Sequence, residues 1–368
     1  MVKKLIEWVK WLLERLIQLV WYIPRQIIWH IPRDTFYVQG RYLYSPRGYK
    51  VLLRGVNKMF LFDPVDPQGT ISLPEIRKTG ANSVRIVWGI TQNAERGGTP
   101  TDPAVLDTLI TAAKQNRMIP MIELHDATGQ WDRLPDLVNY WVQPQIVNII
   151  QQHQKYLLVN IGNEVGGSDP NSDGTIPDQN VFVSSYTNAI QTMRAAGIHT
   201  PLVIDAPNFG KDLDMLNKTA ATLLKADPDK NLIFSVHTYW SILHEGADAN
   251  FINTKLKNAV ALNYPLIVGE FSQWGAYNQG QDICSGGGEV DYQAILQACA
   301  TYEIGWYAWE WGPGNGYVPG TDPPRYDGPC QVMDMTPDRL FVNLKPGWAK
   351  EVAISSPYSI KNSSETYL

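Results

Sequence analysis

The segments LLVNIGNE (residues 157–164) and PLIVGEF (residues 265–271) decide the fold, because each is a short apolar run that closes on an acid. Both runs are rich in β-branched residues, which is typical of strands buried on both faces of a parallel sheet. Glu164 and Glu270 therefore stand where buried strands emerge. A charged carboxylate at such a place costs free energy unless neighbouring groups stabilise it, which favours a pairing or chemical role for both acids.

The same pattern repeats along the chain from about residue 35 onward, with helical periodicity between the apolar runs, as in AVLDTLITAAKQ (residues 104–115). Eight strands that alternate with helices predict a closed (β/α)8 barrel, the TIM barrel. The alternative, a doubly wound sheet, needs a Gly-rich phosphate loop after its first strand, and the sequence contains none. The strands are predicted at Val51 to Val56, Ser83 to Trp88, Ile119 to Leu124, Leu157 to Ile161, Leu202 to Asp205, Leu232 to Val236, Leu266 to Glu270 and Gly305 to Trp309.

Composition narrows the possible partners. The 368 residues are 44% hydrophobic and 18% charged, which suits one large catalytic domain. The net charge of −5 and the absence of a basic stripe argue against nucleic acid as a partner. Thirteen Trp and eighteen Tyr are many for this length, and such rings stack on the C–H faces of sugars, although most of them individually can be core residues.

The N-terminal segment differs from the rest of the chain. Polar residues recur at helical spacing in residues 1–18 and apolar residues cover the other side, which predicts an extra N-terminal amphipathic helix. Charges interrupt the apolar stretch and no small-residue cleavage site follows, so we expect neither a cleavable signal peptide nor a spanning helix. The wide apolar face of residues 1–23 favours contact with a membrane surface over packing on the barrel or on a second subunit. We expect an extracellular or membrane-associated location rather than a cytoplasmic one.

The predicted organisation has three parts. Residues 1–34 form the amphipathic segment, residues 35–355 the catalytic barrel, and residues 356–368 a polar tail that wraps the barrel or frays.

Cys299 falls in a predicted helix and is expected to be a small buried hydrophobic residue. Cys284 and Cys330 lie in loops and form a disulfide if the compartment is oxidising, which their spacing alone does not decide.

Polar residues gather at the predicted strand ends, where a barrel of this kind builds its active site. Each has an alternative reading by itself: Arg85 as a core ion-pair partner, His125 or His237 as a buried imidazole, Asp205 as a helix cap. Together they predict one site. Its members are Arg85, His125, Asp126, Asn163, Glu164, Asp205, His237, Tyr239, Glu270 and Trp309.

Seven motifs in this order resemble glycoside hydrolase family 5, the (β/α)8 enzymes that include endo-β-1,4-glucanases and β-mannanases. The resemblance runs from FYVQGRYLY (residues 36–44) through GWYAWEWG (residues 305–312). NE after the fourth strand together with GEF at the seventh is specific in this setting, although either alone is weak. The motifs are RGVN (54–57), SVRIVW (83–88), IELHDATG (122–129), NIGNEV (160–165), SVHTYW (235–240), VGEF (268–271) and GWYAWEW (305–311).

The resemblance implies a retaining mechanism with Glu164 as general acid/base and Glu270 as nucleophile. Such a pair needs a separation of about 5 to 5.5 Å between its carboxyl groups. Glu164 is then expected to be protonated at rest, and Glu270 to stay ionised beside donors such as Arg85 and Tyr239. The resemblance further implies that Asn163 binds the sugar 2-hydroxyl, His237 tunes the acid/base, His125 contacts the sugar at the cleavage subsite and Trp309 forms the stacking floor of that subsite.

Two other acids, Glu123 and Glu310, stand near predicted site residues in the sequence. Glu123 faces the interior one layer below His125, and Glu310 alternates away from Trp309, so both are expected to be structural. Asp126 and Asp205 are expected to support the site. A metal-dependent hydrolase would need clustered ligands such as HxH or HExxH, which the sequence lacks, so we expect no metal and no cofactor. A non-catalytic carbohydrate-binding barrel would have lost an acid, and both acids are present.

The substrate is predicted to be a linear β-1,4-linked polysaccharide cut internally, because the loops after the seventh and eighth strands are long enough to shape several subsites. HDATG (residues 125–129) looks like the loop after the third strand in one bacterial mannanase group of the family. Val165 departs from the Trp that commonly follows the acid/base there, and cellulase members often carry Pro at that position. We expect glucan a little ahead of mannan, with an endo-β-1,4-mannanase as the alternative.

Overall fold

This computed structural model describes residues 33–91, 101–167, 175–275 and 288–368. Residues 33–368 form one compact unit. The predicted N-terminal helix and its membrane contact lie outside the described residues, as does Cys284. Within the described part of the chain, no helix combines the length and apolar character that crossing a membrane requires. The domain boundaries proposed at residues 34 and 355 stay predictions.

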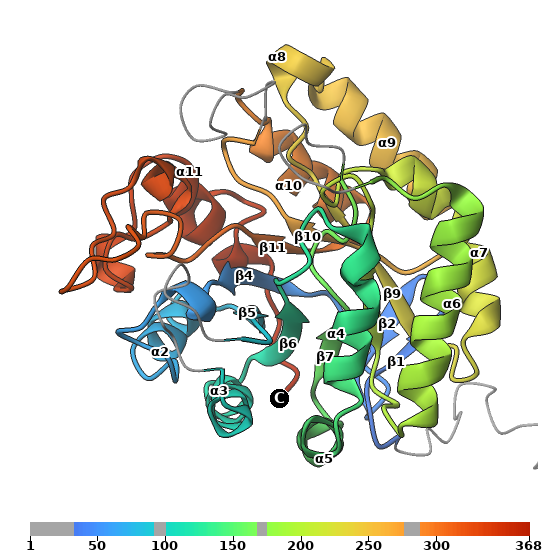
Figure 1. The fold of residues 1–368 in the computed structure, drawn as a ribbon. Helices are drawn as coiled ribbons and strands as arrows, with labels where there is room; N and C mark the ends of the chain where they lie inside the picture. Colours follow the sequence, from blue (N-terminus) through green and yellow to red (C-terminus); the bar gives the residue numbers. More distant parts are fainter. Residues whose placement is uncertain (1–32, 92–100, 168–174, 276–287) are drawn as a thin grey trace, which may run out of the picture. The chain divides into compact units, whose positions relative to one another are not determined.

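Eight parallel strands close into a barrel, with helices packed around it (Figure 1). This confirms the (β/α)8 prediction. All strand residues are buried, because side chains on one face fill the barrel and those on the other pack against helices. The strands are β4 (Arg54–Lys58), β5 (Ser83–Trp88), β6 (Ile119–Leu124), β7 (Leu158–Asn160), β8 (Leu202–Asp205), β9 (Leu232–His237), β10 (Leu266–Glu270) and β11 (Gly305–Ala308).

Four predicted strands have different ends in the structure. The first begins at Arg54, because Val51 pairs with Leu43 in a separate antiparallel sheet instead of entering the barrel. The fourth loses one residue at each end, and the eighth ends at Ala308, which leaves Trp309 just beyond it. The sixth continues through His237, so this side chain closes its strand.

Helices surround the strands, and five of them begin after an aspartate whose side chain accepts a hydrogen bond from a first-turn amide. These caps are Asp102, Asp178, Asp212, Asp248 and Asp291. Such caps satisfy amides that otherwise lack a partner and so fix where each helix starts. The main helices are α2 (Ser72–Arg77), α3 (Pro103–Gln115), α4 (Leu134–Trp141), α5 (Pro144–His153), α6 (Gln179–Ala195), α7 (Leu213–Ala226), α9 (Ala249–Ala261) and α10 (Tyr292–Thr301), with short α8 (Ile242–Glu245), α11 (Trp348–Lys350) and α12 (Ile360–Ser363).

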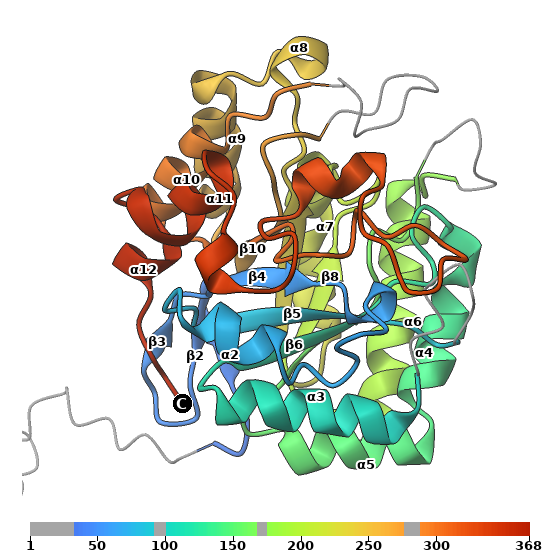
Figure 2. The ribbon, with the colours of Figure 1, turned by 90° about the vertical axis from the view of Figure 1, so that its left-hand side faces the viewer.

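The N-terminal end of the barrel is covered by a small antiparallel sheet of β1 (Tyr37–Gln39), β2 (Tyr42–Tyr44) and β3 (Lys50–Val51). Its apolar residues, such as Phe36 and Leu43, belong to one buried cluster with the lowest layer of the barrel interior. The polar tail packs at this same end, where Tyr367 Oη accepts a hydrogen bond from the Leu52 amide (3.3 Å; Figure 2). The small sheet does not cover the opposite end of the barrel, where the strands have their C-terminal ends and a pocket lies.

The two cysteines in the described part of the chain differ in their state: Cys299 is free and Cys330 is bridged. Cys299 lies on α10, is fully buried and is free, as predicted. Burial raises the pKa of its thiol to about 12, which makes it unreactive. Cys330 is disulfide-bonded.

Candidate active site

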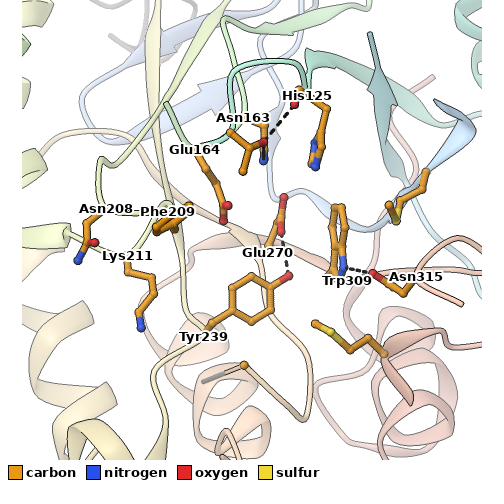
Figure 3. Close-up of a pocket in the computed structure, with 14 residues that line it drawn as sticks. His125, Asn163, Glu164, Asn208, Phe209, Lys211, Tyr239, Glu270, Trp309 and Asn315 are labelled. Atoms are coloured by element: carbon orange, nitrogen blue, oxygen red, sulfur yellow. Dashed lines mark hydrogen bonds between the residues drawn. The ribbon is translucent and has the colours of Figure 1, made fainter. Parts of the chain in front are cut away.

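A pocket of about 560 Å³ opens at the C-terminal ends of the strands (Figure 3). Six of the predicted residues line it, while Arg85 and His237 are fully buried and lie behind the pocket wall. The remaining lining residues were not predicted. The wall consists of Met59, His125, Thr128, Asn163, Glu164, Asn208, Phe209, Lys211, Tyr239, Glu270, Gly275, Trp309, Asn315 and Met333.

Glu164 is held in a strained backbone conformation. It follows β7 with a φ of 47°, a left-handed value that costs a non-glycine residue about 1–3 kcal/mol. Two hydrogen bonds fix it there: its amide donates to Asp205 Oδ2 (3.2 Å), and its carbonyl accepts from the Gly129 amide (2.9 Å). Its carboxyl group is thereby turned toward the pocket and toward His237.

Glu270 owes its position to an irregularity in β10. The pairing with β9 shifts register between Val268 and Glu270, which marks a bulge. Gly269 permits this bulge, because a Cβ there would lie 2.2 Å from Ser235 Oγ. The Glu270 carboxylate accepts hydrogen bonds from Arg85 Nη1 (2.7 Å) and Tyr239 Oη (2.8 Å), the two donors expected from the sequence.

Arg85 is the centre of a buried polar network. Besides its bond to Glu270, its guanidinium donates to the side-chain oxygens of Asn57, Asn160 and Asn163 at 2.8–3.1 Å. Burial disfavours its charged form, but the surrounding carboxylates outweigh this and raise its pKa. Asn57 and Asn160 were not predicted as members of the site, although both stand in the motifs RGVN and NIGNEV.

The two acids lie close together. One oxygen of Glu164, one oxygen of Glu270 and a ring nitrogen of His237 all lie within 4.8 Å of one another. Three such groups could also hold a metal ion. However, Arg85 donates to Glu270 from inside the barrel, and His237 Nδ1 is already bonded to Glu164 (2.6 Å), so both the charge and the geometry disfavour a cation here.

The protonation of this cluster differs from the expectation that Glu164 is the protonated group at rest. Burial works against a charged His237, but the negative charges of Glu270 and Asp205 and the hydrogen bond to Glu164 outweigh it and raise the pKa of His237 to about 9. Burial raises the pKa of Glu164, yet the bond to His237 and its charge outweigh this and lower it. Glu164 is thus an acceptor beside a protonated imidazole. The sequence analysis brought His237 to this acid but not the combined negative charge of Glu270 and Asp205, which keeps the imidazole protonated.

Burial also raises the pKa of Glu270, and the charge of Glu164 acts in the same direction. His237 and Arg85 oppose this shift with their positive charges. Glu270 therefore has the donors that the sequence predicted, but its pKa is raised, whereas an acid held ionised was expected to have a low pKa. A neutral Glu164 would no longer contribute the negative charge that helps to raise the pKa of Glu270.

One side of the pocket is built on Trp309. His125 stacks parallel to it, with ring centroids 5.9 Å apart and planes 13° apart. Its indole Nε1 donates to Asn315 Oδ1 (2.9 Å), and the Asn315 amide group donates to Asp334 Oδ1 (3.0 Å). Asn315 and Asp334 lie in the long loop after β11, where no sequence pattern points to them.

The two acids predicted to be structural do serve as supports. Glu123 is fully buried and accepts from His125 Nδ1 at 3.0 Å. Glu310 is also buried and accepts from the Met59 amide (2.7 Å), which ties the loop after β4 to the loop after β11. Burial raises the pKa of Glu310 well above its usual value, and it shares a hydrogen bond with Asp334. Asp126 likewise acts on backbone, accepting from the Ile90 amide at 2.7 Å.

The sequence matches the cellulase model of glycosyl hydrolase family 5 over residues 45–315, well over half of the chain. It is 29% identical over 294 residues to a mannan endo-1,4-beta-mannosidase of Cellvibrio japonicus (strain Ueda107), covering 78% of this chain but only 61% of that protein. A mannan endo-1,4-beta-mannosidase of Salipaludibacillus agaradhaerens is also 29% identical, over 75% of this chain and 81% of that protein. The crystal structure of a beta-mannanase from Streptomyces thermolilacinus is similar with a TM-score of 0.71 at 29% identity, covering 90% of this chain and 98% of that one. The chain therefore belongs to glycosyl hydrolase family 5.

Proposed function

We propose that this protein is a retaining endo-β-1,4-mannanase in which Glu270 is the nucleophile and Glu164 the general acid/base. The observation that carries the mechanism is the distance of at most 4.8 Å between one oxygen of each carboxyl group. A retaining pair is about 5–5.5 Å apart, whereas an inverting pair is about 6.5–9.5 Å apart to leave room for water.

In the first step, a Glu270 oxygen attacks the anomeric carbon while Glu164 donates a proton to the glycosidic oxygen. The bond between the anomeric carbon and the glycosidic oxygen breaks. This leaves a glycosyl ester on Glu270 and releases the rest of the chain. In the second step, the Glu164 carboxylate takes a proton from water, and that water attacks the anomeric carbon and frees Glu270.

The proton for the first step is already in the site. It lies on the hydrogen bond of 2.6 Å between His237 Nδ1 and Glu164 Oε1. Its transfer to Glu164 makes this residue an acid and His237 neutral, without changing the number of bound protons. It also removes the negative charge that raises the pKa of Glu270, so that Glu270 is favoured as a carboxylate at the moment of attack.

Mannan is supported over glucan by the relatives, which are named as mannosidases, and by the loop after β6. Glucose and mannose differ at the 2-hydroxyl, which Asn163 is predicted to bind. Thr128, in the HDATG segment, accepts a hydrogen bond from Asn163 Nδ2 (3.0 Å) and so fixes the direction of this amide. The sequence analysis placed glucan a little ahead of mannan, with Val165 departing from the Trp that commonly follows the acid/base in the mannanase group, whereas the relatives favour the mannanase alternative.

We expect reducing ends to be released from galactomannan or glucomannan at least about tenfold faster than from carboxymethyl cellulose or barley β-glucan, because a hydroxyl of the wrong orientation leaves buried polar groups unpaired. The assay is reducing-sugar release at equal polymer mass. Faster cleavage of cellulose or β-glucan would select the endoglucanase alternative, and release from none of the four polymers would reject the substrate class.

The pH profile tests the shared proton. Because the pKa of His237 is raised to about 9, this proton stays bound until the pH rises through that value, so kcat/KM should fall above about pH 9. In His237→Gln the only remaining acid is Glu164 itself, and the alkaline limb should move down by roughly one pH unit or more. His199→Gln, which changes an exposed imidazole, should leave the limb in place. An unchanged limb in His237→Gln would contradict the shared proton.

A further inference from the structure

The loop after β8 has an unusual backbone. Asn208, Phe209 and Gly210 are consecutive left-handed residues, with φ values of 57°, 53° and 73°. Left-handed residues normally occur singly, and Phe is not among the side chains that tolerate this conformation well. Strain of this kind persists only where the surroundings impose it, and it is concentrated at functional sites.

Three neighbouring parts of the barrel impose this conformation. The Phe209 ring fills the space left by two glycines: a Cβ at Gly129 or Gly167 would lie 2.7 or 2.4 Å from ring atoms. The Phe209 amide donates to the Gly166 carbonyl (3.1 Å). The Gly210 carbonyl accepts from the His237 amide (2.8 Å). The loop is therefore a rigid part of the pocket wall.

The loop lies on the Glu164 side of the pocket. Figure 3 shows Asn208, Phe209 and Lys211 beyond Glu164, whereas Trp309 and Asn315 lie beyond Glu270. Gly210 packs directly against the imidazole that bonds to Glu164, since a Cβ there would lie 2.7 Å from His237 Nδ1. An acid that protonates the glycosidic oxygen stands between the sugar that is attacked and the sugar that leaves.

The chemistry of the loop suits a neutral sugar. Among the residues that the structure describes, none forms a hydrogen bond with the Asn208 side-chain amide, which lines the pocket and is partly exposed. The ammonium group of Lys211 is paired with Glu245 (2.9 Å), so the loop presents little net charge. An amide beside an aromatic ring offers a hydrogen-bonding group and an apolar contact to a hydroxylated ring.

We propose that Asn208, Phe209 and Lys211 form the subsite for the leaving-group sugar, with the Asn208 amide as its hydrogen-bonding group. This inference rests on the proposed roles of Glu164 and Glu270. The subsite binds the departing end of the chain in the first step and a sugar acceptor in the second.

The test compares two substrates in Asn208→Gly, a change that removes the amide and keeps a left-handed backbone accessible. A 2,4-dinitrophenyl β-mannobioside needs no leaving-group sugar, whereas mannohexaose does. If the polymer assay selects glucan, the corresponding gluco-compounds are used. We expect kcat/KM for the hexaose to fall roughly tenfold and that for the aryl glycoside to stay within about twofold, because one hydrogen bond is lost with one substrate only.

The matched control is Asn263→Gly. Asn263 is also left-handed, with a φ of 58°, but precedes β10 at the opposite end of the barrel, so neither substrate should be affected. A second readout is the fraction of glycosyl-enzyme captured by added mannotriose, which should also fall in Asn208→Gly. Equal losses with both substrates, or no loss with the hexaose, would overturn the subsite. If the wild-type protein cleaves neither substrate, it is the proposed function that fails.

Discussion

Glu270→Ala should reduce hydrolysis of the preferred polymer by roughly 10⁴-fold or more, within the range seen when a covalent nucleophile is removed. Without this carboxylate no glycosyl ester can form, and the Arg85 and Tyr239 donors no longer hold an attacking group at the anomeric carbon. The measurement is kcat/KM for mannohexaose, with Glu289→Ala as the control because this side chain is exposed.

Azide distinguishes a lost nucleophile from a damaged fold. The small anion can enter the space left by Glu270 and attack the anomeric carbon of a 2,4-dinitrophenyl β-mannobioside, with dinitrophenolate leaving in the same step. One displacement inverts the configuration, so the product should be the α-mannobiosyl azide. Formation of the β-azide, or hydrolysis that survives the substitution, would contradict the role of Glu270.

Glu164→Ala should show a loss that depends on the leaving group. Hydrolysis of mannohexaose should fall by about 10²–10⁴-fold, the usual contribution of a general acid, because the departing sugar alkoxide needs a proton. With the dinitrophenyl glycoside the first step needs no proton, so a rapid burst of dinitrophenolate should precede slow turnover. Stopped-flow absorbance measures both phases.

Azide again reports the role of the missing group. It should speed up turnover of Glu164→Ala by attacking the glycosyl-enzyme without a general base, and two displacements should give the β-azide. If both substrates lose activity equally and no burst is seen, Glu164 is not the acid/base. The opposite configurations of the azides from the two variants assign the two carboxylates independently of any rate.

The fold was largely readable from local pattern. Runs such as SVRIVW and IPMIEL, buried on both faces, start and end where predicted because nothing but a central parallel strand suits them. Val51 was misplaced because an apolar residue next to a strand has the same local character whether it pairs in the barrel or, as here, with Leu43 in the covering sheet. Only tertiary pairing distinguishes the two cases.

The predicted site residues meet because barrel closure brings the carboxyl ends of all strands to one face. Asn208 and Phe209 could not be predicted, since their left-handed backbone depends on contacts with Gly129, Gly167 and His237. Asn315 reaches Trp309 from a long loop whose path no periodicity describes.

The resting position of the proton was also beyond the sequence. Residue types and strand ends indicate which acids meet, but not that the His237 imidazole lies 2.6 Å from Glu164 and 3.6 Å from Glu270. These contacts, together with the charge of Asp205, raise the pKa of the imidazole so that it carries the proton. Protonation thus depends on the packed environment, which a local sequence pattern does not show.

The most direct test of the double-displacement account is to trap its covalent intermediate. Wild-type protein is incubated with a 2-deoxy-2-fluoro-β-mannobiosyl fluoride, whose fluorine at C2 slows the second step more than the first, and is then digested and sequenced by mass spectrometry. We predict one equivalent of sugar in ester linkage to Glu270. Label on Glu164, or turnover of the fluoride without any labelled carboxylate, would contradict the assignment of Glu270 as the nucleophile.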